Sequence, residues 1–374
     1  MLIELHMLQS FCPSNLNRDD TNNPKDCEFG GVRRARISSQ CIKRAIRTCP
    51  QFQRATQVES AARSRRMIGE RLQPALLQAG KTAEEATKVL TAFVPAYLSK
   101  LDRDGERTSV LLYLSREEID AINEALLANW DHLLTGDKAA LEGIVKELTK
   151  RFRSHTSAPD IALFGRMLAE RPELNLEAAC QVAHALSTHR VSMEMDWWTA
   201  VDDLQPEDTA GAGMMGFAAY DSACFYRYAC IHWEQLASTL RDADLASRTV
   251  EGFMRAAIAA VPSGKQNSYA AYSMPSLLVG VVRQDGMAWS LANAFERPVA
   301  PDREGGYVRP SARALDAYWG RLCQVYGKSQ LRAVAVLAVD DDLELANLGD
   351  ERVESQDEWL KELLGALPAG RREP

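Results

Sequence analysis

The sequence has 374 residues, of which 44 are basic and 51 acidic, so its net charge is −7 at neutral pH. This length suits two or three domains of about 100–200 residues each, and a hydrophobic content of 46 % is ordinary for a globular protein. No apolar run approaches the roughly 18–20 residues of a membrane span, and the first residues carry no basic leader. We therefore expect neither membrane insertion nor an export signal.

The cysteines are the next compositional constraint. There are eight of them, they are scattered, and no two form a C-x-x-C pair. Several fall on apolar or strand-like stretches. This usage is typical of buried thiols in a cytoplasmic protein and argues against a disulfide framework or a zinc site.

In chain order, the first predicted elements are a strand and a helix separated by a polar segment. Residues 2–9 alternate in the manner of a strand, and residues 13–26 are rich in turn formers and are not expected to pack. A short extended piece over 29–37 leads to a pair of serines. Either serine can cap a helix that ends near residue 49.

Residues 60–187 follow a helical pattern almost throughout. Two helix starts carry the capping-box sequence, Thr82 with Glu85 and Ser115 with Glu118. The pattern therefore predicts a helical insertion or subdomain.

A second set of strands and helices follows this helical block. The pattern predicts strands at 189–195, 224–233, 276–283 and 331–339, and helices ending at Pro262, over 311–326 and after Ser355. With the helical block set aside, the order is strand, helix, strand, strand, helix, strand. This is the order of the ferredoxin-like fold that RNA-recognition domains share, so we expect an α+β protein.

The strongest functional signal is a basic strip from Phe29 to Val58, which contains seven bases and no acid. The rest of the chain therefore carries a net charge of −14. An acidic protein with one concentrated basic strip is expected to bind a polyanion, nucleic acid above all. The competing interpretation is a solvated surface face.

Within the strip, the spacing of the bases favours phosphate binding. Two glycines permit close backbone approach to a ligand, and the amides at the start of the following helix suit a phosphate. Lys43 and Arg47 are expected to share one face of that helix. On the preceding strand, Arg34 and Arg36 are expected on one side and Arg33 on the other.

Paired acids occur at Asp19-Asp20, at 202–203 and at 340–342. Such pairs invite a metal-site interpretation, but turns that cap their own backbone are the more ordinary outcome, and we favour that outcome here. We expect no metal and no cofactor.

The segment around Trp197 and Trp198 has a different character. Adjacent residues of a strand point to opposite sides, so at most one of these tryptophans can belong to an ordinary core. An exposed aromatic or methionine on a hairpin beside a basic groove can wedge between bases. The alternative is packing under the neighbouring loop, which contains Gly211, Gly213 and Gly216.

Several of these segments resemble the CasC family, the backbone subunit of Cascade, the type I-E CRISPR surveillance complex. The N-terminal signature is P-S-N-L-N-R-D-D from residue 13, followed by F-G-G-V-R-R-A-R-I-S-S-Q from residue 29. Further matching segments, in the family's order, are D-I-A-L-F-G-R-M (160–167), D-W-W-T-A-V-D-D-L-Q (196–205), F-Y-R-Y-A (225–229), G-K-Q-N-S-Y-A-A (264–271) and S-L-A-N-A-F-E (290–296).

The resemblance implies a hand-shaped subunit. Its RNA-recognition-like palm would comprise residues 1–57 and 188–374, with a β-hairpin thumb at about 190–224, and a helical fingers domain would comprise 58–187. Copies would stack along the CRISPR RNA as a right-handed filament, and each thumb would displace one base. The partners implied are CRISPR RNA, target DNA through the guide, other copies of the chain and other Cascade subunits, in the cytoplasm. The resemblance also implies a subunit that is not itself a nuclease in this subtype, and so a non-catalytic one.

The resemblance also implies the residues of an RNA-binding surface. These are Ser38, Gln40, Lys43, Arg44 and Arg47 in the palm groove, with Arg34 from the same strip; Arg166 and Met167 from the fingers; Trp197, Trp198 and Thr199 from the thumb; Lys265, Gln266 and Asn267 as a second backbone clamp; and Arg18 and Lys25 in a loop reaching towards the target strand or a neighbouring copy.

Two other functions stay open at this point. One is a ribonuclease on an RNA-recognition fold, with His189 or one of the Asp pairs as catalyst. The sequence contains no nucleophile elbow, Walker loop or H-E-x-x-H helix to support catalysis. The other is an assembly protein whose basic strip meets an acidic protein neighbour.

Overall fold

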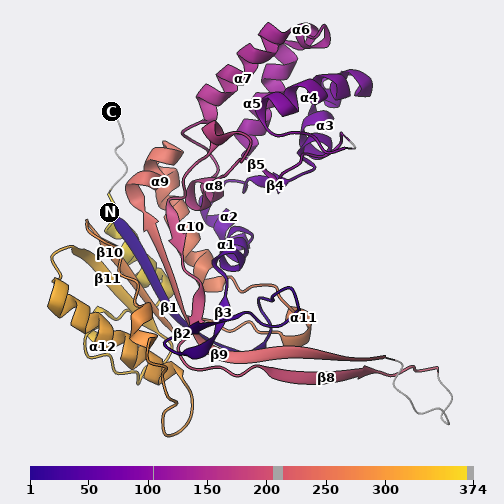
Figure 1. Cartoon of the computed structure of the whole chain (residues 1–374). Helices are drawn as coiled ribbons and strands as arrows, with labels where there is room; N and C mark the ends of the chain where they lie inside the picture. Colours follow the sequence, from indigo (N-terminus) through magenta and orange to yellow (C-terminus); the bar gives the residue numbers. More distant parts are fainter. Residues whose placement is uncertain (104, 205–213, 369–374) are drawn as a thin grey trace. The chain divides into compact units, whose positions relative to one another are not determined.

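The computed structural model describes residues 1–103, 105–204 and 214–368, and the chain divides into two compact units (Figure 1). The first unit comprises Met1–Phe52, Val182–Cys230 and most of the chain from Phe253 onward, and the second comprises Gln53–Gln181 and Ile231–Gly252. The boundaries drawn from the sequence place Ile231–Gly252 with the palm instead.

A large sheet organises the first unit. Within the described ranges it has nine strands, seven of them in the order β11-β10-β1-β9-β7-β3-β2, with β6 and β8 each paired to β9. The strands are β1 (Leu2–Ser14), β2 (Asp26–Phe29), β3 (Val32–Ile37), β6 (Cys180–Val182), β7 (Ala185–Ser187), β8 (Glu194–Ala200), β9 (Met214–His232), β10 (Leu277–Arg283) and β11 (Leu331–Ala338).

Four of these strands form a ferredoxin-like core. In chain order the core reads β1, α1 (Ser39–Arg47), β7, β9, α10 (Ala243–Ala259) and β10. In the sheet, the first strand lies between the third and the fourth, in the order β10-β1-β9-β7. Strand β1 pairs antiparallel with β10 from Leu2 opposite Arg283 to Leu8 opposite Leu277. The predicted α+β class is therefore confirmed, and these four strands follow the ferredoxin-like order.

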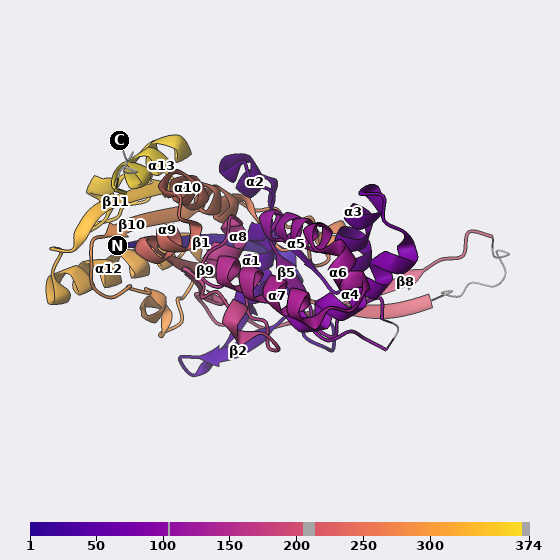
Figure 2. The ribbon, with the colours of Figure 1, turned by 90° about the horizontal axis from the view of Figure 1, so that it is seen from above.

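Helices cover both faces of this sheet. On one face, Val279 and Val281 of β10 pack in a buried cluster with Trp319 of α12 (Val308–Tyr326). On the other face lies α13 (Gln356–Gly365), which Figure 2 shows beside β10 and β11. Gly280 permits this close packing, because a Cβ there would lie 2.2 Å from a methyl carbon of Leu363.

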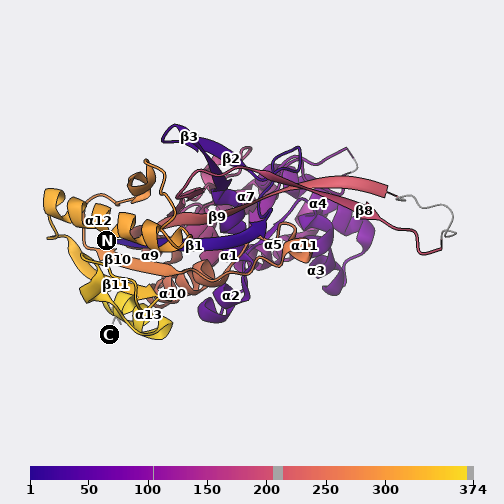
Figure 3. The ribbon, with the colours of Figure 1, turned by 90° about the horizontal axis from the view of Figure 1, so that it is seen from below.

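The thumb hairpin consists of β8 and the first residues of β9. Glu194 lies opposite Tyr220 and Ala200 opposite Met214 in an antiparallel ladder, and Figure 3 shows the two strands running away from the sheet as a ribbon. The predicted strand at 224–233 is thus the inner half of a longer strand. Two of the glycines named from the sequence, Gly211 and Gly213, lie outside the described residues.

The second unit is mainly helical. It contains a π-helical turn η1 (Ile68–Leu72), helices α3 (Gln73–Gln78), α4 (Ala83–Tyr97), α5 (Arg116–Ala128), α6 (Trp130–Leu134), α7 (Lys138–Phe152), α8 (Pro159–Phe164) and α9 (Trp233–Leu240), and the short turn η2 (Pro172–Leu174). It also contains a two-stranded sheet, β4 (Ala62–Ser64) with β5 (Leu112–Leu114). The helical pattern missed these strands, because three residues are too few to show alternation.

The remaining short elements are α2 (Pro50–Thr56), α11 (Gln266–Tyr269), η3 (Ala292–Phe295) and η4 (Gly349–Glu351). Among the helices that the structure describes, none combines the length and the apolarity that a membrane span requires.

One of the two predicted capping boxes is complete. The Thr82 hydroxyl accepts from the amide of Glu85 at 3.3 Å, and the Glu85 carboxylate accepts from the amide of Thr82 at 3.1 Å. The other box is only half formed. The Ser115 hydroxyl accepts from the amide of Glu118 at 3.1 Å, but the carboxylate of Glu118 is turned away to another partner.

Candidate nucleic-acid interface

At the start of helix α1, the backbone amides of Ser39 and Cys41 are already in use. The Ser38 hydroxyl accepts from the amide of Cys41 at 3.3 Å, and the imidazole Nδ1 of His184 accepts from the amide of Ser39 at 3.0 Å. From the sequence, a phosphate is predicted at the first amides of this helix. That expectation is wrong for Ser39 and Cys41, since their hydrogens already point at protein acceptors.

His184 was missed from the sequence because it lies 145 residues from the helix it caps. Burial lowers its pKa, and the positive charges of Arg36 and Lys25 lower the pKa further. The ring is therefore neutral at neutral pH and can accept the amide hydrogen bond. The second cause also places the positive charges of Arg36 and Lys25 close enough to the start of α1 to act on this ring.

The polar segment before β2 is ordered, contrary to expectation. Ser14, Asn15 and Leu16 are buried. The side-chain Nδ2 of Asn15 donates to the carbonyl oxygens of Asn22 at 3.0 Å and Ala219 at 2.9 Å, which ties the segment to the foot of the thumb hairpin.

Asp19 forms the self-capping turn that the sequence predicts. Its carboxylate accepts from the amides of Thr21 and Asn23, each at 2.9 Å. The carboxylate also accepts from the Thr21 hydroxyl at 2.8 Å. The hydroxyl bond first, and then the two amide bonds, lower the pKa of Asp19. Across the described ranges, no group of three or more His, Cys, Asp or Glu side chains is arranged to hold a metal ion.

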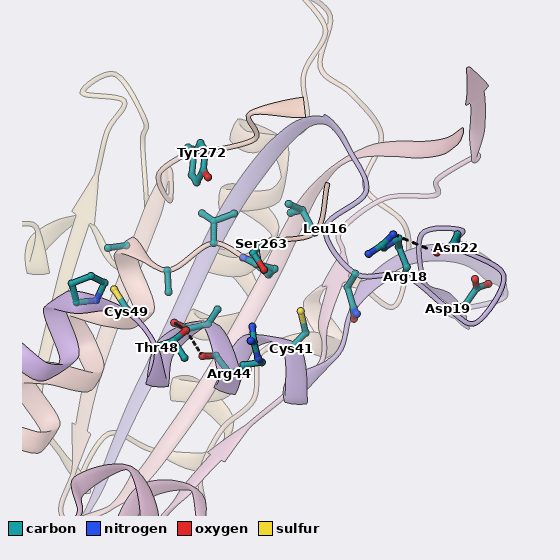
Figure 4. A pocket seen from close by; sticks show the side chains of 18 residues that line it. Leu16, Arg18, Asp19, Asn22, Cys41, Arg44, Thr48, Cys49, Ser263 and Tyr272 are labelled. Atoms are coloured by element: carbon teal, nitrogen blue, oxygen red, sulfur yellow. Dashed lines mark hydrogen bonds between the residues drawn. The ribbon is translucent and has the colours of Figure 1, made fainter. Parts of the chain in front are cut away.

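A groove of about 620 Å³ lies between three segments of the first unit (Figure 4). One wall is α1, through Cys41, Arg44 and Thr48; another is the loop from Leu16 to Asn22; and the third is the segment 259–264, with Tyr272. Gly264 lets the second and third walls meet, since a Cβ there would lie 2.3 Å from the carbonyl oxygen of Leu16.

The predicted palm residues divide between this groove and its surroundings. Arg18 and Arg44 line the groove and are exposed. Gln40 and Asn267 are also exposed, and Lys25, Lys43, Arg47 and Lys265 are half-buried, whereas Ser38 is buried as the helix cap. The exposed cationic groups of the groove therefore come from two segments far apart in the sequence.

Arg34 does not belong to a nucleic-acid surface. Its side chain is fully buried, and its guanidinium donates to the carbonyl oxygens of Phe29 at 3.1 Å, Ser187 at 3.2 Å, Phe295 at 2.7 Å and Glu296 at 3.2 Å. Four of the five N–H donors of the guanidinium are engaged by carbonyl oxygens, and the side chain has no exposed surface at which to meet a phosphate. The predicted RNA contact of Arg34 is therefore corrected to a structural role.

Gln266 is a second correction. Its side chain is buried, donates to the carbonyl oxygen of Pro262 at 3.0 Å and accepts from the amide of Ala271 at 2.8 Å. Lys265 and Ala270, on either side of α11, adopt positive φ angles of 48° and 47°. Gln266 thus stabilises a strained turn, and only its neighbours Lys265 and Asn267 remain candidates for RNA contact.

Arg166 is the third correction. Its side chain is 1 % exposed, and its guanidinium lies 2.6 Å from the carboxylate of Glu118 on α5. Met167, the next residue, is 81 % exposed. The two residues therefore have opposite roles, one inside the second unit and one at its surface.

The thumb hairpin exposes both tryptophans, so neither belongs to a buried core. Trp197 is 71 % exposed and its ring lies 5.8 Å from that of Phe217, directly opposite on β9. Trp198 is 42 % exposed and lies against Gly216, where a Cβ would come within 2.4 Å of its ring. Thr199 is exposed as well.

His189, the candidate catalyst, is buried with both ring nitrogens engaged. Its Nε2 accepts from the amide of Cys224 at 3.2 Å, and its Nδ1 donates to the carbonyl oxygen of Arg190 at 2.9 Å. Burial lowers its pKa. The ring therefore lacks the exposed nitrogen that a general base would use. Among the paired acids that were the other candidate catalysts, Asp340 forms an ion pair with Arg309, with 2.5 Å between Oδ2 and Nε.

Comparisons with known proteins agree with this picture. A family described as CT1975-like protein matches residues 3–365, and no curated protein matches the chain. A chain of a solved "CRISPR RNA-guided surveillance complex, pre-nicking" is similar at 32 % identity with a TM-score of 0.84, over 98 % of this chain and 100 % of that one. A chain of another "CRISPR RNA-guided surveillance complex" is similar at 27 % identity with a TM-score of 0.76, over 98 % and 100 %. The resemblance found in the sequence is confirmed.

Proposed function

Because the chain belongs to the CT1975-like family of Cas proteins, we propose that it is a non-catalytic subunit that binds CRISPR RNA. In this proposal several copies assemble along one guide RNA and form the backbone of a Cascade-type complex of type I-E in the cytoplasm. The subunits hold the RNA backbone and kink it at regular intervals. The guide segments between kinks then pair with target DNA in antiviral defence.

The groove of the first unit is the observation that carries this proposal. Arg18 and Arg44 line it from two different segments, with the positive field of Arg36 and Lys25 at the start of α1 beside it. The one carboxylate of the groove, Asp19, is engaged by the amides of its own turn. Such a groove suits a sugar–phosphate backbone, whose binding carries no sequence information, so target choice is left to base pairing.

The exposed apolar side chains supply the contacts with bases. Met167 in the second unit and the two tryptophans of the thumb hairpin are exposed without covering a core. Aromatic and methionine side chains can pack against unstacked bases of any sequence. They are therefore suited to displacing bases from a guide that is otherwise held by its phosphates.

The dependence of RNA affinity on salt tests the groove directly. The logarithm of the binding constant should fall linearly with the logarithm of the salt concentration, by about 0.7 per phosphate neutralised on a single strand. Arg44→Ala should reduce that slope by about one phosphate's share for any RNA sequence. The matched control is Arg321→Ala, an exposed arginine of α12 outside the groove, which should leave the slope unchanged.

Fluorescence anisotropy with a labelled CRISPR RNA, repeated over a series of salt concentrations, measures these slopes. If Arg44→Ala and Arg18→Ala both keep the wild-type slope, the RNA backbone does not lie in the groove. The basic strip would then serve a protein partner instead.

A further inference from the structure

Met167 stands alone at the surface between two buried neighbours. It is 81 % exposed, whereas Arg166 is 3 % and Leu168 is 1 % exposed. Methionine has three rotatable bonds and no fixed rotamer when it is unpacked. The position of this side chain must therefore be determined by the backbone that carries it.

That backbone is fixed on both sides of the methionine. Arg166 and Leu176 exchange two backbone hydrogen bonds, each of 2.9 Å. On the other side, the side-chain oxygen of Asn175 accepts from the amide of Leu168 at 2.6 Å. The chain enters this loop through Gly165, whose φ of +76° is open to glycine but rarely to other residues.

The side chain of Arg166 fastens the same loop to helix α5. Its Nη1 donates to the carboxylate of Glu118 at 2.6 Å, and its Nε donates to the carbonyl oxygen of Leu174 at 3.0 Å. Burial raises the pKa of Glu118, and the charge of Arg166 opposes that rise. One ion pair thus joins α5 to both ends of the Met167 loop.

A buried ion pair is an inefficient way to stabilise a fold. Its desolvation cost often exceeds the Coulombic gain, so apolar side chains of the same volume can serve stability equally well. What the pair does supply is direction, because a guanidinium holds its acceptors in a fixed planar geometry. Here the fixed geometry of the guanidinium orients the loop that carries the exposed Met167.

We propose that Glu118 and Arg166 are positioning residues for Met167: they fix the loop Gly165–Leu176 so that the methionine meets nucleobases of the guide at one set place. The inference rests on the proposed function. It replaces the RNA contact that the resemblance implies for Arg166 with an indirect role, and it gives Glu118, Asn175 and Gly165 a part in RNA binding without contact.

A double-mutant cycle on RNA affinity tests this inference with the full chain and a labelled CRISPR RNA. Met167→Ala should weaken binding by about two- to ten-fold, the range of a sulfur–aromatic contact. Arg166→Lys keeps the charge but loses the planar fork, and it should weaken binding by a similar or smaller factor. In the Met167→Ala background, Arg166→Lys should cause no further loss, because its effect acts through the methionine.

Two variants keep the test valid. Arg151→Lys alters the exposed ion pair with Glu117, one residue before Glu118, and should leave affinity unchanged. Asn175→Ala removes only the acceptor for the Leu168 amide from an exposed side chain. If melting curves show that Arg166→Lys does not fold, Asn175→Ala takes its place in the cycle with the same expectation.

The outcomes separate the inference from the function on which it rests. Equal losses from Arg166→Lys with and without Met167 would overturn the positioning role. In that case the wild-type protein would still bind RNA. Absence of wild-type binding would instead refute the proposed function.

Discussion

At the scale of single residues, Asp221 lies where the thumb hairpin leaves the sheet. It lines a cavity of about 350 Å³ together with Asp26, Arg33 and Arg190. Burial, and secondly the charge of Asp26, raise its pKa to about 7. The unfolded chain ionises this carboxyl near pH 3.8, so the folded state binds an additional proton between those two values.

The sign of the pH effect follows from linkage. Because the folded pKa is raised, the stability that Asp221 contributes is complete below about pH 4 and is lost as the pH rises through 7. Asp221→Asn cannot ionise, so its melting temperature should exceed that of the wild type by more at pH 8 than at pH 5. Thermal melts at both values measure the difference, with the exposed Asp20→Asn as control. A difference that does not grow with pH would contradict the assignment.

Individual residues also show where sequence reasoning stops. Arg34, Arg166 and Gln266 lie in segments that match an RNA-binding family, yet all three are buried. Their partners are carbonyl oxygens, a carboxylate and, for Gln266, a backbone amide. For Arg34 two of the carbonyl oxygens come from 153 and 261 residues away. An arginine that faces solvent in the basic strip and an arginine that binds buried carbonyl oxygens look identical in the sequence. Only the folded chain distinguishes them.

At the scale of elements, the groove depends on how closely three segments pack. Gly264 is the point of closest approach, with the carbonyl oxygen of Leu16 at 2.3 Å from where a Cβ would be. Gly264→Ala should separate the loop before β2 from the segment after α10. We expect weaker RNA binding and a lower free energy of unfolding, because neither of the two backbones can yield without moving its neighbours.

The control for this substitution is Gly143→Ala in helix α7. Apart from its chain neighbours and the backbone of its own helix, no heavy atom lies within 4 Å of a Cβ at Gly143. Removing a helical glycine should raise the free energy of unfolding by about 0.5–1 kcal/mol. Urea unfolding and RNA affinity measure both variants. If Gly264→Ala behaves like Gly143→Ala, the groove does not depend on this contact.

The elements themselves were largely predictable where periodicity was long. The strand at 276–283 and the helix at 311–326 correspond to β10 (Leu277–Arg283) and α12 (Val308–Tyr326), because their apolar residues keep one period over several turns or pairs. The loop before β2 was not predictable. Its polar residues predict an unpacked segment, but the side chain of Asn15 donates to the carbonyl oxygens of Asn22 and Ala219. Hydrogen bonds from side chains to the backbone produce no periodic pattern in the sequence.

At the scale of the whole molecule, the charge distribution suits assembly on RNA. The chain is acidic overall, with a net charge of −7, while its groove carries arginines from two segments. Copies placed along one RNA would share its phosphates among their grooves. The family was predictable from the sequence because its matching segments run from residue 13 to residue 296, whereas a single motif would have left the fold open.

The most direct test of this account is to co-express the chain with a CRISPR array and the other complex subunits, purify the assembly, and identify what it holds. Sequencing of the extracted nucleic acid gives the RNA, and native mass spectrometry gives the number of copies per RNA. The account predicts one uniform CRISPR RNA bound by several copies of this chain. Heterogeneous RNA, or an assembly without RNA, would contradict it.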